Sequence, residues 1–333
     1  MAQNGLASTY ATIGRHSDAI ALFRIVLERR TKKWGPENAR TLNAQNNLAE
    51  ALKDSGDYQA AALLHREVLE SRRRVLGDTH RATLTSMNNL SIVYAQWGQM
   101  DDAIALLEKT VQGRTQLLGE SHPDTIRSKT NLYSALMLSG DLEQVIQGLK
   151  QQLPNIEQVF GRNHPDTIQA CDILAQAYRK VGRTEDAVKI YRDIIPKSSD
   201  AFGTEHPNTL RVQANLATAL ASLRLYDEAA EMYEKTLLQQ RAAIGSDHPD
   251  TLRTQVNVAI CLHRSNRVDH AVQHLEDAAA RAIAKLEWKH PLTFECHMNL
   301  AAIYSIKALD DKVITTYELM TDQLARHLGV EHS

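Results

Sequence analysis

The tetrapeptide His122-Pro123-Asp124-Thr125 has the most obvious chemical potential in this sequence. An imidazole beside a carboxylate and a hydroxyl supplies ligand atoms for a metal ion and groups for acid–base catalysis. Either chemistry requires several such groups to converge on one point in space. The elements that carry the tetrapeptide therefore decide what it can do.

The tetrapeptide belongs to a leader motif that recurs along the chain. "GESHPDTI" at Gly119 has close copies, and each begins 42 residues after the previous one, without insertion. The leaders start at Gly35, Gly77, Gly119, Gly161, Gly203 and Gly245; Glu287 takes the glycine position of the next copy, and Gly329 restarts the motif. A fixed period of this kind predicts a repeat architecture.

The repeat argues against a metal or catalytic role for the leader. Successive copies fall on successive helix pairs, and packed helices stand about 8–10 Å apart, whereas zinc requires nitrogen ligands at about 2.0–2.1 Å. A J-domain, which also uses a His-Pro-Asp tripeptide, has one copy in a loop between two helices. Pro123 suits a first helical turn, and Asp124 and Thr125 favour the same helix N-terminus. We predict that His122 caps this helix or packs across the turn between repeats.

Composition excludes several classes of protein. The formal charge is −2, and Trp34, Trp97 and Trp288 show no regular interleaving with basic residues, so no nucleic-acid partner is expected. No run approaches the roughly 18–20 apolar residues that span a bilayer, so no membrane partner is expected, and no secretory signal is visible. Three widely spaced cysteines without a C-x-x-C pair indicate a reducing compartment, and we predict a cytoplasmic protein.

No catalytic set is defined by local spacing. No Ser-His-Asp or Cys-His arrangement is apparent, and each of the three cysteines falls at a different phase of the repeat. They are Cys171, Cys261 and Cys296, which we interpret as small buried hydrophobic residues. We therefore expect neither an enzyme nor a bound cofactor or metal.

Each repeat is predicted to form two helices. In one repeat, apolar residues follow a 3.6 period over residues 123–139, and a second helix is expected over 141–160. Gly119 suits a left-handed C-terminal cap, while Pro154 and Pro196 should kink or break their helices. A single helix pair cannot bury its own apolar face, so the pairs must stack into one all-α solenoid. The pairs are expected at about residues 1–35, 36–77, 78–119, 120–161, 162–203, 204–245, 246–287 and 288–329.

The pattern resembles tetratricopeptide repeats of the 42-residue kind found in kinesin light chains. The residues that carry the resemblance are the leader, "NNLS" at Asn88 with "NNLA" at Asn46, and "YAQWGQMDDA" from Tyr94. The resemblance implies a right-handed α-solenoid and a non-catalytic scaffold that binds protein or peptide partners. Similar arrays form the C-terminal sensors of NACHT or NB-ARC receptors, although no G-x-x-x-x-G-K-[ST] phosphate-binding loop occurs here.

A recurring asparagine has two interpretations. In kinesin light chains, asparagines of the "NNLA" segment hold the backbone of bound peptides; alternatively, they satisfy polar groups of the neighbouring repeat. Carried over by position, the resemblance points to Asn46, Asn47, Asn88, Asn89, Asn131, Asn215, Asn257 and Asn299. The pattern is broken at Asp172-Ile173, where the carry-over is in doubt.

Positions that differ between repeats favour an acidic ligand. On the expected concave face of the first helices, basic residues gather at Arg127, Arg179, Lys180, Arg211, Arg253 and Arg264, opposed mainly by Asp172, with Glu50 and Asp54 towards the N-terminal end. A solvated face with weak ion pairs is the alternative. Because the planar guanidinium suits carboxylates, we predict a groove that binds an extended, acidic peptide or partner segment.

Two further functions stay open at this point. The array could be the sensor or regulatory part of a NACHT/NB-ARC-type signalling ATPase, or it could self-associate through uncapped ends. We also expect the chain to be a piece of a longer protein, because residues 1–34 lack a leader and a new leader starts at Gly329.

Overall fold

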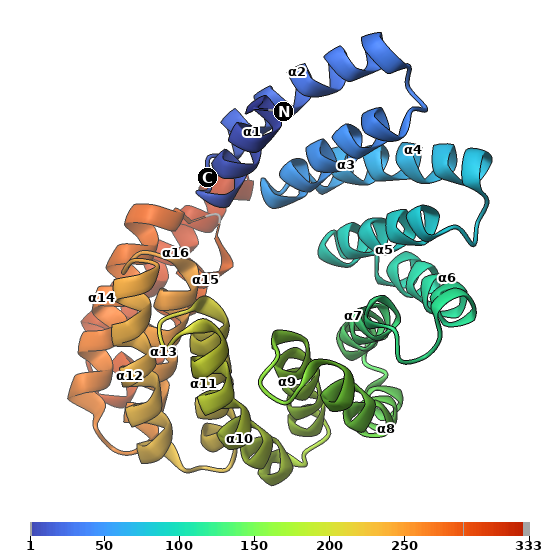
Figure 1. The fold of residues 1–333 in the computed structure, drawn as a ribbon. Coiled ribbons are helices and arrows are strands. Elements are labelled where there is room, and N and C mark those ends of the chain that lie inside the picture. The colour runs from blue at the N-terminus through green and yellow to red at the C-terminus, as the bar shows by residue number, and fades with distance from the viewer. Residues whose placement is uncertain (1, 289, 329–333) are drawn as a thin grey trace. The chain divides into compact units, whose positions relative to one another are not determined.

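The computed structural model describes residues 2–288 and 290–328, and over these residues the chain is helical, with sixteen helices and no strand. The chain divides into two compact units (Figure 1). The first unit ends at Gly161, the second begins at Arg162, and each is described by itself. The first unit contains α1 (Ala2–Thr12), α2 (His16–Trp34), α3 (Ala39–Asp54), α4 (Tyr58–Leu76), α5 (Arg81–Gln96), α6 (Met100–Leu118), α7 (Pro123–Ser139) and α8 (Leu142–Phe160). The second contains α9 (Pro165–Lys180), α10 (Thr184–Phe202), α11 (Pro207–Ser222), α12 (Tyr226–Ala243), α13 (Pro249–Arg264), α14 (Val268–Leu286), α15 (Pro291–Ile306) and α16 (Asp310–Leu328).

The helices form eight pairs within the described residues, which confirms the predicted all-α solenoid of tetratricopeptide type. Within each unit, every helix packs against the next one in sequence. Some successive odd-numbered helices also touch one another: α5 touches α7, α9 touches α11 and α13 touches α15. The odd-numbered helices therefore line the inner face of each unit, and the even-numbered helices lie outside them. The restarted leader at Gly329 lies outside the described residues.

The leader histidines cap helices. His122 precedes α7, and its Nδ1 accepts a hydrogen bond from the backbone N–H of Asp124 at 3.1 Å, while Pro123 occupies the first helical turn. The same cap, from imidazole to the N–H two residues later, is present at His80, His122, His164, His206, His248 and His290. Asn38 caps α3 in the same way through its side-chain oxygen. The capping interpretation of the leader is confirmed.

The glycine that begins each leader has a backbone conformation that differs from the predicted one. Gly119 has a positive φ of 89°, as expected, but its ψ of 164° is extended and not left-handed helical. This region of φ and ψ is accessible essentially only to glycine. Glu287 stands in the same slot after α14 with φ 60° and ψ 176°. The strain that glycine avoids elsewhere is therefore present at Glu287.

Replacing this residue by the glycine of the other repeats should stabilise the second unit. We expect Glu287→Gly to raise the free energy of unfolding by about 1 kcal/mol, because relief of backbone strain exceeds the added entropy of an unfolded glycine. Urea unfolding followed by circular dichroism measures the change. Glu287→Ala removes the charge and keeps the Cβ, so it should give no gain; equal stabilisation by both variants would contradict the backbone explanation.

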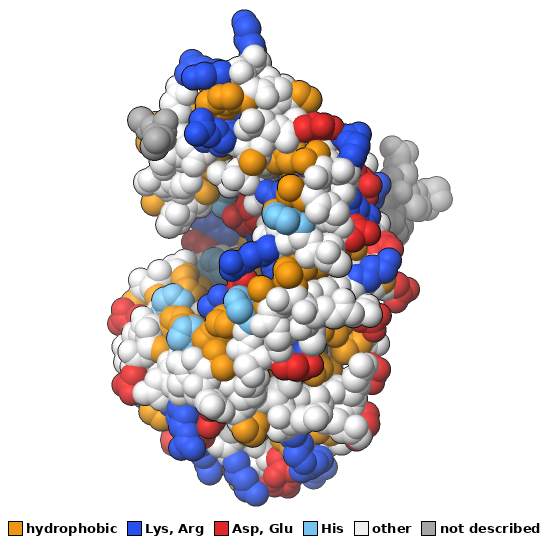
Figure 2. Space-filling model, turned by 45° about the vertical axis from the view of Figure 1, so that its right-hand side comes forward, with side chains coloured by type: hydrophobic (Ala, Val, Ile, Leu, Met, Phe, Trp, Pro, Cys, Tyr) orange, Lys and Arg blue, Asp and Glu red, His pale blue; other side chains and the backbone are white. Residues whose placement is uncertain are grey.

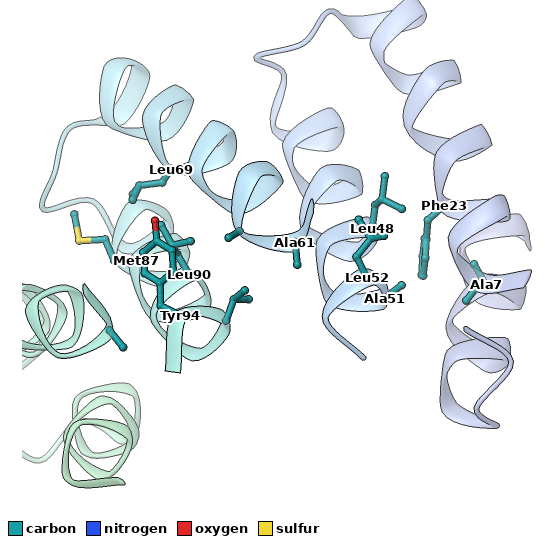
Figure 3. Packing of buried hydrophobic residues seen from close by; sticks show 14 of the residues in the cluster. Ala7, Phe23, Leu48, Ala51, Leu52, Ala61, Leu69, Met87, Leu90 and Tyr94 are labelled. Atoms are coloured by element: carbon teal, nitrogen blue, oxygen red, sulfur yellow. The ribbon is translucent and has the colours of Figure 1, made fainter. Parts of the chain in front are cut away.

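The core of the first unit continues across its helix pairs. Phe23, Leu48, Leu52 and Leu90 are each at most 4% exposed and belong to one cluster that links α2 to α5 (Figure 3). Small residues such as Ala61 let neighbouring helices approach closely within this cluster. Stacking of successive pairs therefore buries the apolar faces that a single pair would leave exposed.

Two buried arginines tie successive pairs together in the first unit. Arg114 on α6 donates to the carbonyl of Asp124 at 2.9 Å and to Ser128 Oγ at 2.6 Å, both on α7. Arg72 on α4 makes the equivalent bonds to α5, at the carbonyl of Ala82 and at Ser86 Oγ. Burial lowers the pKa of both guanidinium groups, although both stay charged.

Two internal prolines do not interrupt their helices. Pro154 lies inside α8 and Pro196 lies inside α10, and both helices continue to their leader glycines. The helices are therefore not broken at these prolines, and the predicted alternative, a kink, stays a prediction. Each proline removes a single backbone donor, and buried neighbours such as Ile156 and Ile194 keep the helices packed.

Candidate functional site

A groove of about 330 Å³ opens on the second unit and holds four of the predicted binding residues. It lies between α11 and α13, and the C-terminal end of α12 closes one side. Its lining consists of Pro207, Asn208, Leu210, Arg211, Ala214, Asn215, Thr218, Gln240, Ile244, Asp250, Arg253, Thr254 and Asn257. Arg211, Asn215, Arg253 and Asn257 come together here.

Helical spacing explains why these residues share one face. Arg211 and Asn215 are four residues apart on α11, and Arg253 and Asn257 occupy the same two positions on α13. Residues separated by four positions lie above one another on a helix. Since α11 and α13 belong to successive repeats, the two arginine–asparagine pairs stand side by side.

The two groove arginines have different electrostatic surroundings. Arg211, about half exposed, forms an ion pair with Asp172 on α9, whose own side chain is 2% exposed. The second carboxylate oxygen of Asp172 accepts a hydrogen bond from Asn215 Nδ2 at 3.0 Å. Asp172 is thus a buried carboxylate with both oxygens paired. In the sequence, Asp172 interrupts the series of recurring asparagines. In the structure it does not line the groove but bonds to Arg211 and Asn215, which do.

Arg253 is the exposed cation of the groove. Within residues 2–288 and 290–328, no carboxylate lies within ion-pairing distance of its guanidinium. The position that corresponds to Asp172 in the next repeat is Ala214, which carries no charge. Asp250 also lines the groove, but its side chain is directed to the cap, 3.8 Å from His248 Nδ1. Arg253 therefore remains available to an anionic group.

Two tyrosines of the outer helices lie beneath this face. The hydroxyl of Tyr233 on α12 is 2.6 Å from the hydroxyl of Thr218, which lines the groove, and burial raises the pKa of Tyr233 to about 12. Tyr191 on α10 is fully buried, and its hydroxyl has no hydrogen-bond partner in the described part of the chain. Burial, and then the nearby Asp172 carboxylate, raise the pKa of Tyr191 far above its usual value. Both phenols stay protonated near neutral pH.

Several of the predicted asparagines bridge neighbouring repeats. In the first unit, side-chain amides donate to side-chain oxygens of the preceding pair: Asn47 to Asn4 at 3.3 Å, Asn89 to Asn46 at 3.0 Å and Asn131 to Asn88 at 3.3 Å. In the second unit, Asn215 uses Asp172 instead, and Asn299 bonds to the carbonyl of Glu295 in its own helix. The bridging interpretation therefore describes Asn47, Asn89, Asn131 and Asn215, whereas Asn299 bonds only within α15. Their contact with a peptide stays a prediction.

The other predicted basic residues do not line this groove. Arg179 and Lys180 end α9, and Arg264 ends α13. Arg264 lies eleven residues beyond Arg253, which is about 16 Å along a helix. Arg127 belongs to the first unit, where it lies 3.9 Å from Asp124 and over the ring of Phe160. The predicted basic stripe is therefore divided, and the groove holds two of its six members.

Nine of the thirteen groove residues are not among the predicted binding residues, and three of these show why. Gln240 and Ile244 come from the end of a second helix, whereas the prediction considered only the first helix of each pair. Thr218 lies three residues beyond Asn215 on the same face of α11, so helical spacing could have identified it.

The buried cysteines do not provide a reactive thiol. Burial raises the pKa of Cys261 to about 11 and that of Cys296 to about 12, so both thiols stay protonated at neutral pH. On the face in Figure 2, Lys and Arg side chains alternate with Asp and Glu. Over the described ranges, no three His, Cys, Asp or Glu side chains gather as metal ligands, and no helix is both long and apolar enough to cross a bilayer.

Comparisons with known proteins agree on the repeat type. Family profiles described as tetratricopeptide repeat match residues 1–74, 83–124, 174–237 and 208–284. A Podosopora anserina protein with nearly identical tetratricopeptide-like repeats, described as a kinesin light chain, is 27% identical, with a TM-score of 0.53; the match covers 60% of this chain and 95% of that chain. No curated protein matches the sequence significantly.

Two structures of lower identity match nearly the whole chain. A signal transduction ATPase with numerous domains from Pyrococcus horikoshii, which has a tetratricopeptide repeat sensor, is 13% identical with a TM-score of 0.68; the match covers 98% of this chain and 48% of that chain. The apo form of the quorum sensor NprR from B. thuringiensis is 12% identical with a TM-score of 0.69, covering 97% and 86%. At these identities, the likeness concerns the fold.

Proposed function

Because this chain belongs to the tetratricopeptide repeat family, we propose that it is a protein–protein interaction module that binds an extended, acidic peptide segment in the groove between α11 and α13. The observation that carries the proposal is the presence of Arg253 and Arg211 with Asn215 and Asn257 on one preformed face. The module acts as a scaffold and performs no catalysis.

Each class of side chain has a role in this proposal. The guanidinium of Arg253 pairs with an acidic side chain of the ligand, since its planar fork matches a carboxylate. Asn257, half-buried beside it, donates to or accepts from the ligand backbone. Leu210, Ala214 and Ile244 supply an apolar floor against which a ligand side chain packs. A groove formed by rigid helices lowers the ordering cost of binding.

A sensor role is the second candidate. The structural likeness to the P. horikoshii sensor and to the quorum sensor NprR, over nearly the whole of this chain, supports it at the level of the fold. In this role the same groove would receive a regulatory ligand or a partner domain of a signalling ATPase. Self-association through the ends of the array stays a prediction.

Peptide titration at two salt concentrations tests the proposed function. We expect hexaglutamate extended by one tryptophan to bind the protein, and to bind about tenfold more weakly at about 1 M than at about 0.1 M salt, where the Debye length is about 3 Å and about 10 Å, respectively. Hexaglutamine with the same tryptophan is the neutral control. Binding of the acidic peptide that does not respond to salt, or equal binding of both peptides, would reject the acidic-ligand proposal.

A further inference from the structure

The buried carboxylate of Asp172 stands where the other repeats have a neutral side chain. The corresponding residues are Asn4, Asn46, Asn88 and Thr130 in the first unit and Ala214, Val256 and Met298 in the second. Where the residue is asparagine, its amide oxygen accepts one bond from the asparagine of the following repeat, as Asn46 accepts from Asn89. Asp172 keeps that bond through Asn215 and adds an ion pair with Arg211.

From this arrangement we infer that Asp172 is an internal counter-ion that neutralises Arg211 and so sets the charge selectivity of the groove. The inference rests on the proposed function and names the ligand more closely. The groove selects a segment with one acidic side chain opposite Arg253 and an uncharged, hydrogen-bonding residue opposite Arg211. An additional acidic side chain opposite Arg211 has to compete with Asp172 for the same guanidinium.

Burial makes this competition unfavourable for the ligand. The Asp172 side chain is 2% exposed, so a ligand that withdrew Arg211 would leave a carboxylate in the protein interior with Asn215 as its remaining partner. An unpaired buried charge is strongly destabilising. Tyr191, whose buried hydroxyl has no partner among the described residues, lies close enough for Asp172 to affect its titration. The ion pair between Asp172 and Arg211 is therefore favoured over a new pair between Arg211 and the ligand.

The next repeat provides the comparison that isolates this effect. Arg253 occupies on α13 the position that Arg211 occupies on α11, and both line the same groove. Ala214 stands 42 residues after Asp172, so Arg253 has no equivalent counter-ion. The two arginines thus differ in the charge behind them, and also in the groove residue three positions earlier, which is Asn208 for Arg211 and Asp250 for Arg253. Moving the carboxylate from position 172 to position 214 should therefore make Arg211 available to the ligand and neutralise Arg253.

The experiment measures hexaglutamate and hexaglutamine binding, each peptide carrying one tryptophan, to the full chain and two variants. Asp172→Asn retains an acceptor for Asn215 and releases Arg211, so we expect about tenfold tighter binding of hexaglutamate, with a steeper salt dependence. Ala214→Asp places a carboxylate beside Arg253 and should weaken hexaglutamate binding about tenfold. Asp172→Asn should leave hexaglutamine binding unchanged, and Ala214→Asp, which also alters the apolar floor, should weaken hexaglutamate binding far more than hexaglutamine binding. A purely structural role of Asp172 would affect both peptides alike.

The outcomes separate this inference from the proposed function. If the unaltered chain binds hexaglutamate and Asp172→Asn leaves the affinity unchanged or lowers it, the counter-ion inference is overturned and the proposed binding of an acidic ligand stands. If neither the unaltered chain nor Asp172→Asn binds hexaglutamate above hexaglutamine, both are rejected. Thermal unfolding checks that each variant is folded. If Asp172→Asn unfolds, Ala214→Asp decides, because it adds its charge at the groove surface. Unchanged hexaglutamate binding by Ala214→Asp would then overturn the inference.

Discussion

Arg253→Glu is expected to weaken hexaglutamate binding by at least about thirtyfold. The substitution removes the exposed cation of the groove and places a carboxylate where the ligand brings another. Charge-assisted hydrogen bonds contribute about 1.5–3 kcal/mol, which corresponds to roughly 10- to 150-fold in affinity. Repulsion between like charges adds to this loss. Fluorescence titration of the tryptophan-bearing peptide measures it directly.

The matched control reverses an equal charge elsewhere on the same unit. Lys235 is exposed on α12, outside the groove, and Lys235→Glu changes the net charge by the same amount. We expect its effect on binding to be less than about twofold, since exposed charges farther apart than a Debye length are largely screened. If both variants weakened binding equally, the attraction would come from the net charge of the protein and not from the groove. Arg211→Glu is a poorer test, because it would place a second carboxylate beside buried Asp172.

Arg114→Ala should lower the free energy of unfolding of the first unit by about 3 kcal/mol. The side chain is 6% exposed and bonds to the Asp124 carbonyl and to Ser128 on the next helix pair. Truncation removes these two charge-assisted hydrogen bonds and a longer one to Thr85 Oγ1, and leaves the Ser128 hydroxyl and the Asp124 carbonyl with fewer partners. In a repeat protein this loss falls on the coupling between adjacent pairs. Urea unfolding followed by circular dichroism measures it.

Arg81 offers a control that interacts with the same aspartate. Its guanidinium donates to the Asp124 carboxylate at 2.8 Å, but its side chain is 64% exposed. Ion pairs at such positions contribute about 0–1 kcal/mol, so Arg81→Ala should change stability little. A loss in Arg114→Ala no larger than that in Arg81→Ala would show that burial does not make the inter-repeat arginines important.

The repeat and its helix ends could be predicted because the rules that produce them are local. His122 caps α7 through an N–H only two residues away, and Pro123 takes a position where no donor is needed. A 42-residue period with these signals implies stacked helix pairs without knowledge of any distant contact. Where local rules conflicted, the predicted break did not occur: a proline inside a helix usually kinks or breaks it, yet packing keeps α8 and α10 continuous.

The functional site could be predicted only in part, because charge pairing depends on neighbours that are distant in sequence. Arg211 and Arg253 look equivalent along the chain, and only the stacking of α9 on α11 reveals that one of them faces a buried carboxylate. Gln240 and Ile244, at the end of α12, line the groove because the chain folds back at the turn between helices. The position of a residue within the repeat does not by itself predict this contact. Residue type and period therefore decide which helices form and how they are capped. The rotation and spacing of the packed helices decide which of their polar side chains meet, because ion pairs and hydrogen bonds form only over a few ångströms.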